Sequence, residues 1–339
     1  VFAQLAGTML LLEEEEKKRV KGTIINKFRG DVSILKPGLR MLEEKINTSV
    51  LGVIPYFHID IEDEDSLTER FRKKSRSGLA KIAVIRLPRI SNFTDIAPLE
   101  AVDELDVSYV SNISQFGDPD VVIIPGSKNT ISDLLWMRQN GLEGKILRHA
   151  AKGGIVFGIC GGYQMLGQSI SDPTGAEQKG TVRGMGLLPV TTVFEQEKRR
   201  TRVSGRFAKV GGALAEMSGV CYEGYEIHMG RTVLSKGTVP LVYMEEEGEQ
   251  RQDGAQSDHV YGCYMHGIFD MSETVKTFLA AVLRKKGIDP SKITVRDRNA
   301  YKEEQYDRLA SIVRENLNME AVYKIIEKGN EASCSLLSE

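Results

Sequence analysis

Three short apolar segments constrain the fold of the central part of this chain more than any other feature. They are KIAVIRLP from Lys81, DPDVVIIPG from Asp118 and GGIVFGICGG from Gly153, with polar or helix-compatible segments between them. Strands that are apolar on both faces are typical of parallel sheets covered by helices. Beyond Arg183 the segments alternate apolar and polar residues more clearly, which indicates a mixed or antiparallel part. The pattern therefore predicts an α/β protein.

The first sixty residues contain a second set of alternating elements. After an N-terminal helix, GTIINKF from Gly22 predicts a strand, PGLRMLEEKIN a helix opened by Pro37, and SVLGVIPYF from Ser49 another strand. The stretch Ile59–Ser77 is acidic and then basic, without apolar periodicity, so we expect the linker there. The last fifty or so residues have a helical pattern and end in a frayed tail.

Composition excludes several classes of protein. A length of 339 residues favours two domains, and a net charge of -2 gives no field that would attract nucleic acid. The apolar start is followed at once by EEEEKKR and reads as an amphipathic helix, and no apolar segment approaches the roughly 20 residues of a membrane span. The four cysteines have no metal-ligand spacing, so we expect no metal site, no disulfides and a cytoplasmic location.

One segment has the pattern of a reactive cysteine. In GGIVFGICGGYQMLG an apolar strand runs into a glycine-rich turn and then a helix, with Cys160 at the apex. Glycines permit a strained turn, and the helix N-terminus stabilises a thiolate. The amide of Gly161 would hold an oxyanion, and a second donor would come from the turn at Gly126 and Ser127. The alternative is that Cys160 is a small buried apolar residue.

A thiolate nucleophile also needs a base, and His266 is the best candidate among five histidines. It lies at the end of a predicted strand in YGCYMHGIFD, beside Gly267. Its alternative role is structural, with its ring satisfied by the backbone. His228 in GYEIHMG is the rival, and Glu226 of that motif could orient a group or contact substrate, although a packed strand is the simpler interpretation. We expect Cys263 to belong to the core.

The ordered set of motifs resembles the cobyric acid synthase family from Val1 to about Met319. The motifs are RLPRISNFTD (86–95), PGSKNT (125–130), GICGGYQMLG (158–167), GYEIHMGRT (224–232) and YMHGIFD (264–270), preceded by VFAQLAGT, INKFRGD and LGVIPY. The resemblance implies amidation of the b, d, e and g carboxylates of adenosylcobyrinic acid a,c-diamide, using glutamine and ATP with Mg²⁺. Cys160 and His266 match the family's catalytic pair, and Tyr163 and Gln164 match its glutamine-contacting segment. Glutamine and a corrinoid are the implied partners, no bound prosthetic group is expected, and a homo-oligomer is left open.

The resemblance also implies the domain organisation. Residues 1–61 would be the C-terminal part of a Rossmann-like ATP domain related to dethiobiotin synthetase, and 62–80 the linker. Residues 81–285 would form a flavodoxin-like class I glutamine amidotransferase domain, followed by helices and a tail over 286–339.

The chain departs from related families at two points. Ordinary class I amidotransferases have Glu two residues after the histidine, where this chain has Ile268, and what orients His266 stays open. The sequence contains no Gly-x-x-x-x-Gly-Lys-Ser/Thr phosphate loop, so ATP binding would fall to the weaker candidates Asn26 and Lys27. Two alternatives remain, a cobyrinic acid a,c-diamide synthase and a binding module with at most glutaminase activity.

Overall fold

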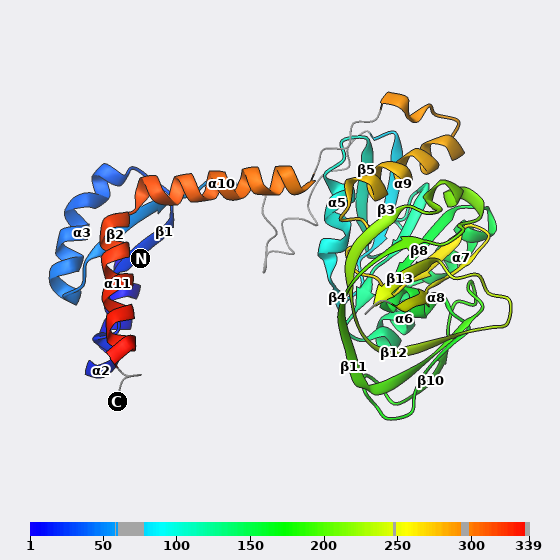
Figure 1. Ribbon diagram of the computed structural model, residues 1–339, viewed down its shortest axis with the longest axis horizontal. Coiled ribbons are helices and arrows are strands. Elements are labelled where there is room, and N and C mark those ends of the chain that lie inside the picture. Colours follow the sequence, from blue (N-terminus) through cyan, green and yellow to red (C-terminus); the bar gives the residue numbers. More distant parts are fainter. Residues whose placement is uncertain (58, 60–77, 247–248, 293–297, 336–339) are drawn as a thin grey trace. The chain divides into compact units, whose positions relative to one another are not determined.

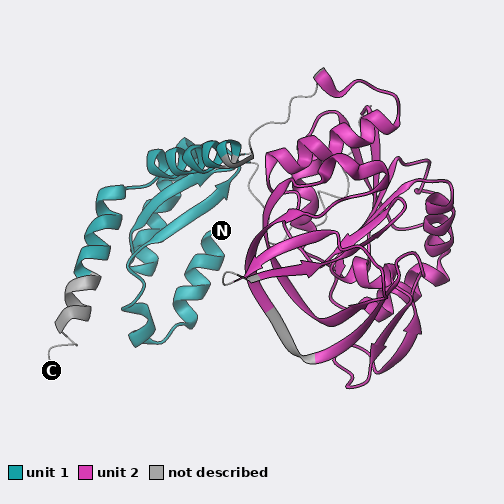
Figure 2. Cartoon of the chain, turned by 45° about the vertical axis from the view of Figure 1, so that its right-hand side comes forward, with its two compact units in different colours: residues 1–62, 299–339 teal, residues 63–298 magenta. Residues whose placement is uncertain are grey.

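The computed structural model describes residues 1–57, 59, 78–246, 249–292 and 298–335 (Figure 1). The chain divides into two compact units, one made of residues 1–62 with 299–339 and the other of residues 63–298 (Figure 2). The expected linker at 62–80 falls mostly outside the described residues, as does the acidic run within it. The C-terminal helices therefore belong to the same unit as the N-terminal strands.

The first unit is a small α/β structure around two parallel strands. Its elements are α1 (Phe2–Leu11), α2 (Glu14–Lys17), β1 (Thr23–Phe28), α3 (Val32–Ile46), β2 (Val50–Pro55), α10 (Arg298–Asn316) and α11 (Met319–Ser335). The helix, strand, helix, strand order predicted for its N-terminal part is present, and β1 pairs with β2 in parallel. Met9, Leu42 and Ile46 form its buried core, where α1 packs against α3.

The helix expected to open at Pro37 begins five residues earlier. Asp31 caps it, because its carboxylate accepts a hydrogen bond from the Ser33 backbone N–H at 2.8 Å. Pro37 lies inside α3 and removes one backbone donor. The prediction was wrong because a capping aspartate with apolar residues after it is a stronger start signal than a proline alone.

The second unit contains the predicted parallel sheet. Its elements up to the nucleophile turn are β3 (Ala80–Ile85), β4 (Ile90–Ser91), η1 (Phe93–Ile96), α5 (Ala97–Glu100), β5 (Leu105–Val110), β6 (Val121–Ile124), β7 (Gly126–Ser127), α6 (Thr130–Gln139), α7 (Leu142–Ala151), β8 (Ile155–Ile159) and α8 (Gly161–Leu166). The six-stranded sheet has the order β15-β16-β8-β6-β3-β5, parallel except for β15. Helices α6, α7 and α8 pack together, as do α5 and α9 (Figure 1).

A second six-stranded sheet follows in the chain, as the alternating pattern beyond Arg183 predicted. Its strands are β9 (Ser169–Asp172), β10 (Gly180–Arg183), β11 (Val190–Phe207), β12 (Cys221–Leu234), β13 (Val242–Glu246) and β14 (Glu249–Asp253), mostly antiparallel. The remaining elements are η2 (Gly212–Met217), β15 (Ala255–Ser257), β16 (Val260–Cys263), α9 (Ser272–Lys285) and η3 (Pro290–Lys292). One continuous hydrophobic core connects both sheets of this unit.

The sheet topology brings distant segments to one edge. Strands β3, β6, β8 and β16 run parallel, so the segments that follow them lie at the same carboxyl edge. These segments carry Asp95, Gly126, Cys160 and His266. No helix within the described parts of the chain is long and apolar enough to cross a membrane.

Candidate active site

Cys160 occupies a sharp turn between β8 and α8, which we call the elbow. Its backbone has φ 52° and ψ -108°, a strained conformation for a residue with a side chain. The turn holds because the Cys160 N–H donates to the Cys263 carbonyl at 2.8 Å and because Gly162 has no side chain. A Cβ on Gly162 would lie 1.9 Å from the Ile124 carbonyl oxygen. The Cys160 side chain is 7% exposed, and its Sγ lies 3.8 Å from the Ile227 carbonyl oxygen.

His266 lies just beyond β16 and is fully buried. Its Nδ1 lies 2.7 Å from Asp95 Oδ2, and Asp95 Oδ1 accepts the Gly267 N–H at 2.9 Å. The Asn92 Nδ2 lies 3.0 Å from His266 Nε2, and the Tyr225 ring stacks on the imidazole with centroids 5.3 Å apart. His266 is thus held on several sides by neighbouring groups.

The electrostatics of this cluster favour a protonated imidazole. Burial lowers the pKa of His266, but hydrogen bonds and charge interactions with Asp95 and Cys160 outweigh burial and raise that pKa to about 10. The imidazole thus interacts with the Asp95 carboxylate and with the Cys160 side chain. The Cys160 and His266 side chains predicted from the sequence are therefore brought together.

The turn at Gly126 and Ser127 lies against His266 and against Gly161, the residue after Cys160. A Cβ on Gly126 would lie 3.1 Å from His266 Cε1, so the missing side chain makes room for the imidazole. A Cβ on Gly161 would lie 2.9 Å from the Ser127 backbone nitrogen, so these two backbone segments face each other. The Ser127 hydroxyl instead donates to Asp133 Oδ2 at 2.7 Å and fixes the turn.

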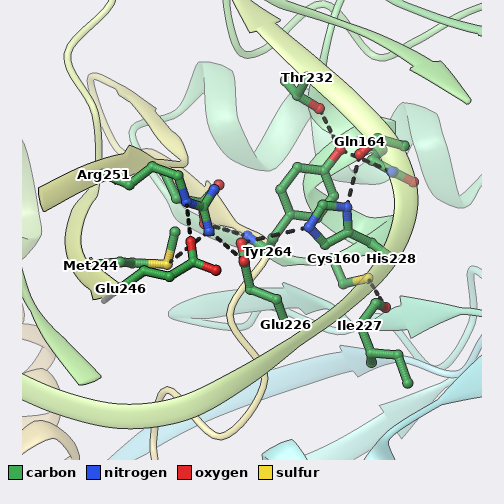
Figure 3. Close-up of polar contacts among 12 residues, drawn as sticks. Cys160, Gln164, Glu226, Ile227, His228, Thr232, Met244, Glu246, Arg251 and Tyr264 are labelled. Carbon is green, nitrogen blue, oxygen red and sulfur yellow. Dashed lines mark hydrogen bonds and ion pairs between the residues drawn. The ribbon is translucent and has the colours of Figure 1, made fainter. Parts of the chain in front are cut away.

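Tyr163 and Gln164 are buried, and their side chains are occupied by internal contacts. Tyr163 packs edge-on against Tyr264, with ring centroids 5.4 Å apart. The Gln164 carboxamide accepts from Thr130 Oγ1 at 3.2 Å. It also donates to the Tyr264 hydroxyl at 3.1 Å (Figure 3). Both side chains therefore support the elbow.

His228, the rival base, has a different environment from His266. Its ring stacks on Tyr264 with centroids 3.7 Å apart, and its Nδ1 contacts the Gly230 carbonyl at 2.8 Å. Cys263 is completely buried, as the sequence predicted. The described residues contain no group of three or more His, Cys, Asp or Glu that could hold a metal ion.

Comparison with known proteins identifies the family of this chain. Residues 81–274, more than half of the chain, match the family model of the CobB/CobQ-like glutamine amidotransferase domain. The cobyric acid synthase of Ruminiclostridium cellulolyticum is 55% identical over 98% of this chain and 65% of its own length. That of Lachnoclostridium phytofermentans is 47% identical over 97% of this chain and 67% of its own length.

The chain belongs to the cobyric acid synthase family.

It spans about two thirds of the length of these cobyric acid synthases. Among solved structures, PurLQS from Thermotoga maritima aligns with 61% of this chain and 99% of its own, at 17% identity and a TM-score of 0.46. A likeness at that level carries no argument about mechanism.

Sequence reasoning missed three residues of this candidate site. Asp95 and Asn92 belong to RISNFTD, and Tyr225 belongs to GYEIHMG, motifs that contributed to the resemblance without being given roles. Asp95 is 171 positions from His266, so no local spacing connects them. The available signal was a polar motif placed after a parallel strand, where ligand and catalytic groups gather.

Proposed function

We propose that this chain hydrolyses glutamine at Cys160. The thiolate attacks the side-chain amide carbon, and His266 gives a proton to the departing nitrogen, which leaves as ammonia. Water then attacks the glutamyl thioester while His266 accepts its proton, and glutamate and the free thiol are released. The observation that carries this proposal is the fully buried His266, held by Asp95 and interacting with the cysteine of the elbow.

The backbone amides of Gly161 and Ser127 are our candidates for the oxyanion hole. They flank the elbow, and negative charge on the amide oxygen of glutamine would develop between them. The close approach of Ser127 to Gly161 supports this assignment. Tyr163 and Gln164 would act indirectly, by fixing α8, since their polar groups are already engaged.

Asp95 would orient the base. An aspartate bonded to Nδ1 fixes the imidazole ring and leaves Nε2, which Asn92 Nδ2 approaches at 3.0 Å, as the nitrogen for the proton transfers. It would thus replace the glutamate that ordinary class I amidotransferases carry two residues after the histidine, where this chain has the buried Ile268.

For the protein as a whole we propose glutamine-dependent amidation of adenosylcobyrinic acid a,c-diamide at its b, d, e and g carboxylates, in the cytoplasm. The identity to named cobyric acid synthases supports this proposal, and the family's reaction would use ATP and Mg²⁺ as cosubstrates. The ammonia released at Cys160 would be the nitrogen source. Residues 1–61 would be part of a Rossmann-like ATP domain, since β1, α3 and β2 form a parallel strand–helix–strand unit.

The described residues of that unit do not by themselves fit ATP. Asn26 and Lys27 are exposed, and the Asn26 carboxamide oxygen accepts the Lys27 backbone N–H at 2.8 Å. No glycine-rich phosphate loop is present in the sequence. We therefore derive no step through ATP from these residues.

Glutamate release from glutamine tests the first proposal. We expect release by the purified chain and its loss in both the Cys160→Ala and His266→Ala variants. Release that continues in the Cys160→Ala variant would contradict the assignment of the nucleophile.

Transfer of amide ¹⁵N from labelled glutamine to a corrinoid, in the presence of Mg-ATP, tests the second. Label in amides formed from adenosylcobyrinic acid a,c-diamide supports cobyric acid synthase activity. Label only in amides formed from cobyrinic acid supports the a,c-diamide synthase alternative. Glutamate release without label in either corrinoid would limit this chain to glutaminase activity.

A further inference from the structure

The segment Tyr225–Ile227 of β12 forms a wall of the catalytic pair. Tyr225 stacks on the His266 ring, and the two residues exchange backbone hydrogen bonds of 3.0 and 2.9 Å. Two residues later, the Ile227 carbonyl oxygen lies 3.8 Å from Cys160 Sγ. A shift of this segment would therefore disturb the nucleophile and the base together.

Glu226 lies between Tyr225 and Ile227, and its side chain makes its contacts away from the catalytic pair. Side chains alternate along a strand, so Glu226 projects to the face opposite Tyr225. It is fully buried and forms an ion pair with the Arg251 guanidinium of β14 (Figure 3). Arg251 is also held by Glu246, with Nε 3.4 Å from Oε2, and by the Met244 sulfur at 3.7 Å.

The pairing of β12 with β11 is continuous from Cys221 to His228 and is interrupted just beyond this segment. The register between β11 and β12 shifts between Phe194, which pairs with Gly230, and Arg199, which pairs with His228. His228, which follows this segment in β12, and Arg251 border a cavity of about 320 Å³, which leaves room for movement. Slippage by one residue would exchange the two faces of β12, turning Tyr225 away from His266.

We propose that Glu226, through its ion pair with Arg251, is a positioning residue that fixes the register of β12 against Cys160 and His266. Glu226 is fully buried and Arg251 is 32% exposed, so the pair is partly removed from water. Ion pairs removed from water are often no more stabilising than apolar replacements, and their best-attested use is to specify one arrangement. The pair joins β12 to β14 across the second sheet. It thereby fixes the segment Tyr225–Ile227 to the hairpin of β13 and β14.

This inference rests on the proposed glutaminase, but its test does not need turnover. The rate at which iodoacetamide alkylates Cys160, resolved from the other cysteines by peptide mass spectrometry, reports the state of the nucleophile directly. Melting curves recorded beside it show the folded fraction. A chain whose Cys160 reacts normally yet releases no glutamate would contradict the proposed function and leave this inference standing.

We expect Glu226→Gln and Arg251→Met to slow Cys160 alkylation at least fivefold in folded protein and to lower kcat more than they change KM. Arg138→Met is the matched control, because Arg138 is similarly exposed, 37% against 32% for Arg251, and pairs with Glu143 away from the site. It should change the rate less than twofold. If Arg251→Met does not fold, Arg251→Lys, which keeps the cation but loses the guanidinium fork, takes its place.

Unchanged alkylation and kcat in folded Glu226→Gln would overturn the proposal. So would an equal loss in the Arg138→Met control, because the effect would then follow general destabilisation.

Discussion

The Asp95 carboxylate holds His266 from a segment that precedes the nucleophile in the chain. Oδ2 lies 2.7 Å from the imidazole Nδ1, and Oδ1 accepts the backbone N–H of the next residue, Gly267. Both Asp95 and His266 are at most 2% exposed, so their interaction is poorly screened by solvent. This position after β3 is why we propose Asp95 as the orienting carboxylate in place of a glutamate two residues beyond the histidine.

Asp95→Asn should lower kcat for glutamate release by roughly 10²- to 10⁴-fold, the range expected when a triad carboxylate is neutralised. Without the carboxylate the pKa of His266 falls, so the alkaline limb of the pH profile should move to lower pH. Initial rates between pH 6 and 10 check both effects. An unchanged profile would remove Asp95 from the mechanism.

The raised pKa of His266 should also make the stability of the folded chain depend on pH. Because the folded-state pKa of His266, about 10, lies above its ordinary value, its contribution to stability is fully present below about pH 6.5. It is lost as pH rises towards 10. Urea unfolding should therefore show a smaller decline of stability between pH 7 and 10 for Asp95→Asn than for the unsubstituted chain, and parallel curves would contradict the raised pKa.

Gly126→Ala should reduce activity at least tenfold. Its methyl group would lie 3.1 Å from His266 Cε1 and 2.8 Å from Ser91 Oγ, so the imidazole must shift. Steady-state glutamate release measures the loss. Gly144→Ala is the control, because its methyl group meets nothing within 4 Å inside α7, and it should raise stability by about 0.5–1 kcal/mol without affecting rate. Equal activity in the two variants would contradict the close fit around His266.

Asp253 should make stability depend on mildly acidic pH. Burial, followed by the charge of Glu226, raises the pKa of this carboxyl to about 6. A raised carboxyl pKa means that the folded state binds the proton more tightly. Its contribution to stability therefore decreases as pH rises from about 4 to about 6, by an amount on the order of 2–3 kcal/mol.

Denaturant unfolding of Asp253→Asn across that interval checks the effect. The variant should lack this decline, while the Tyr264 N–H that Asp253 accepts at 2.8 Å keeps an oxygen partner. Identical pH dependence in both proteins would show that Asp253 titrates normally.

Much of the fold could be predicted because local patterns determine it. Apolar β-rich segments predicted the parallel sheet, and the alternation of apolar and polar residues beyond Arg183 predicted the antiparallel one. Pro37 misled because a residue allowed at a helix start was taken for the start itself, while Asp31 made the capping bond. Pairing of the C-terminal helices with the N-terminal strands depends on contacts such as Leu317 with Gly52, which no local pattern encodes.

The candidate site was only partly predictable for the same reason. The elbow has a local signature, so Cys160, Gly161 and Gly126 could be chosen from sequence. The surroundings of His266 depend on how three loops meet at one sheet edge, which left Asp95 without a role. The family resemblance placed Tyr163 and Gln164 in a glutamine-contacting segment, and that assignment stays a prediction. Their side chains take part in internal packing and hydrogen bonds.

The most direct test of the account is to trap the covalent intermediate. The chain is mixed with glutamine and quenched in acid within the first turnovers, and each cysteine-containing peptide is then weighed by mass spectrometry. We predict a glutamyl adduct on the peptide that contains Cys160, and none in the Cys160→Ala variant. Glutamate release with no adduct on Cys160, or with the adduct on Cys221 or Cys263, would contradict it.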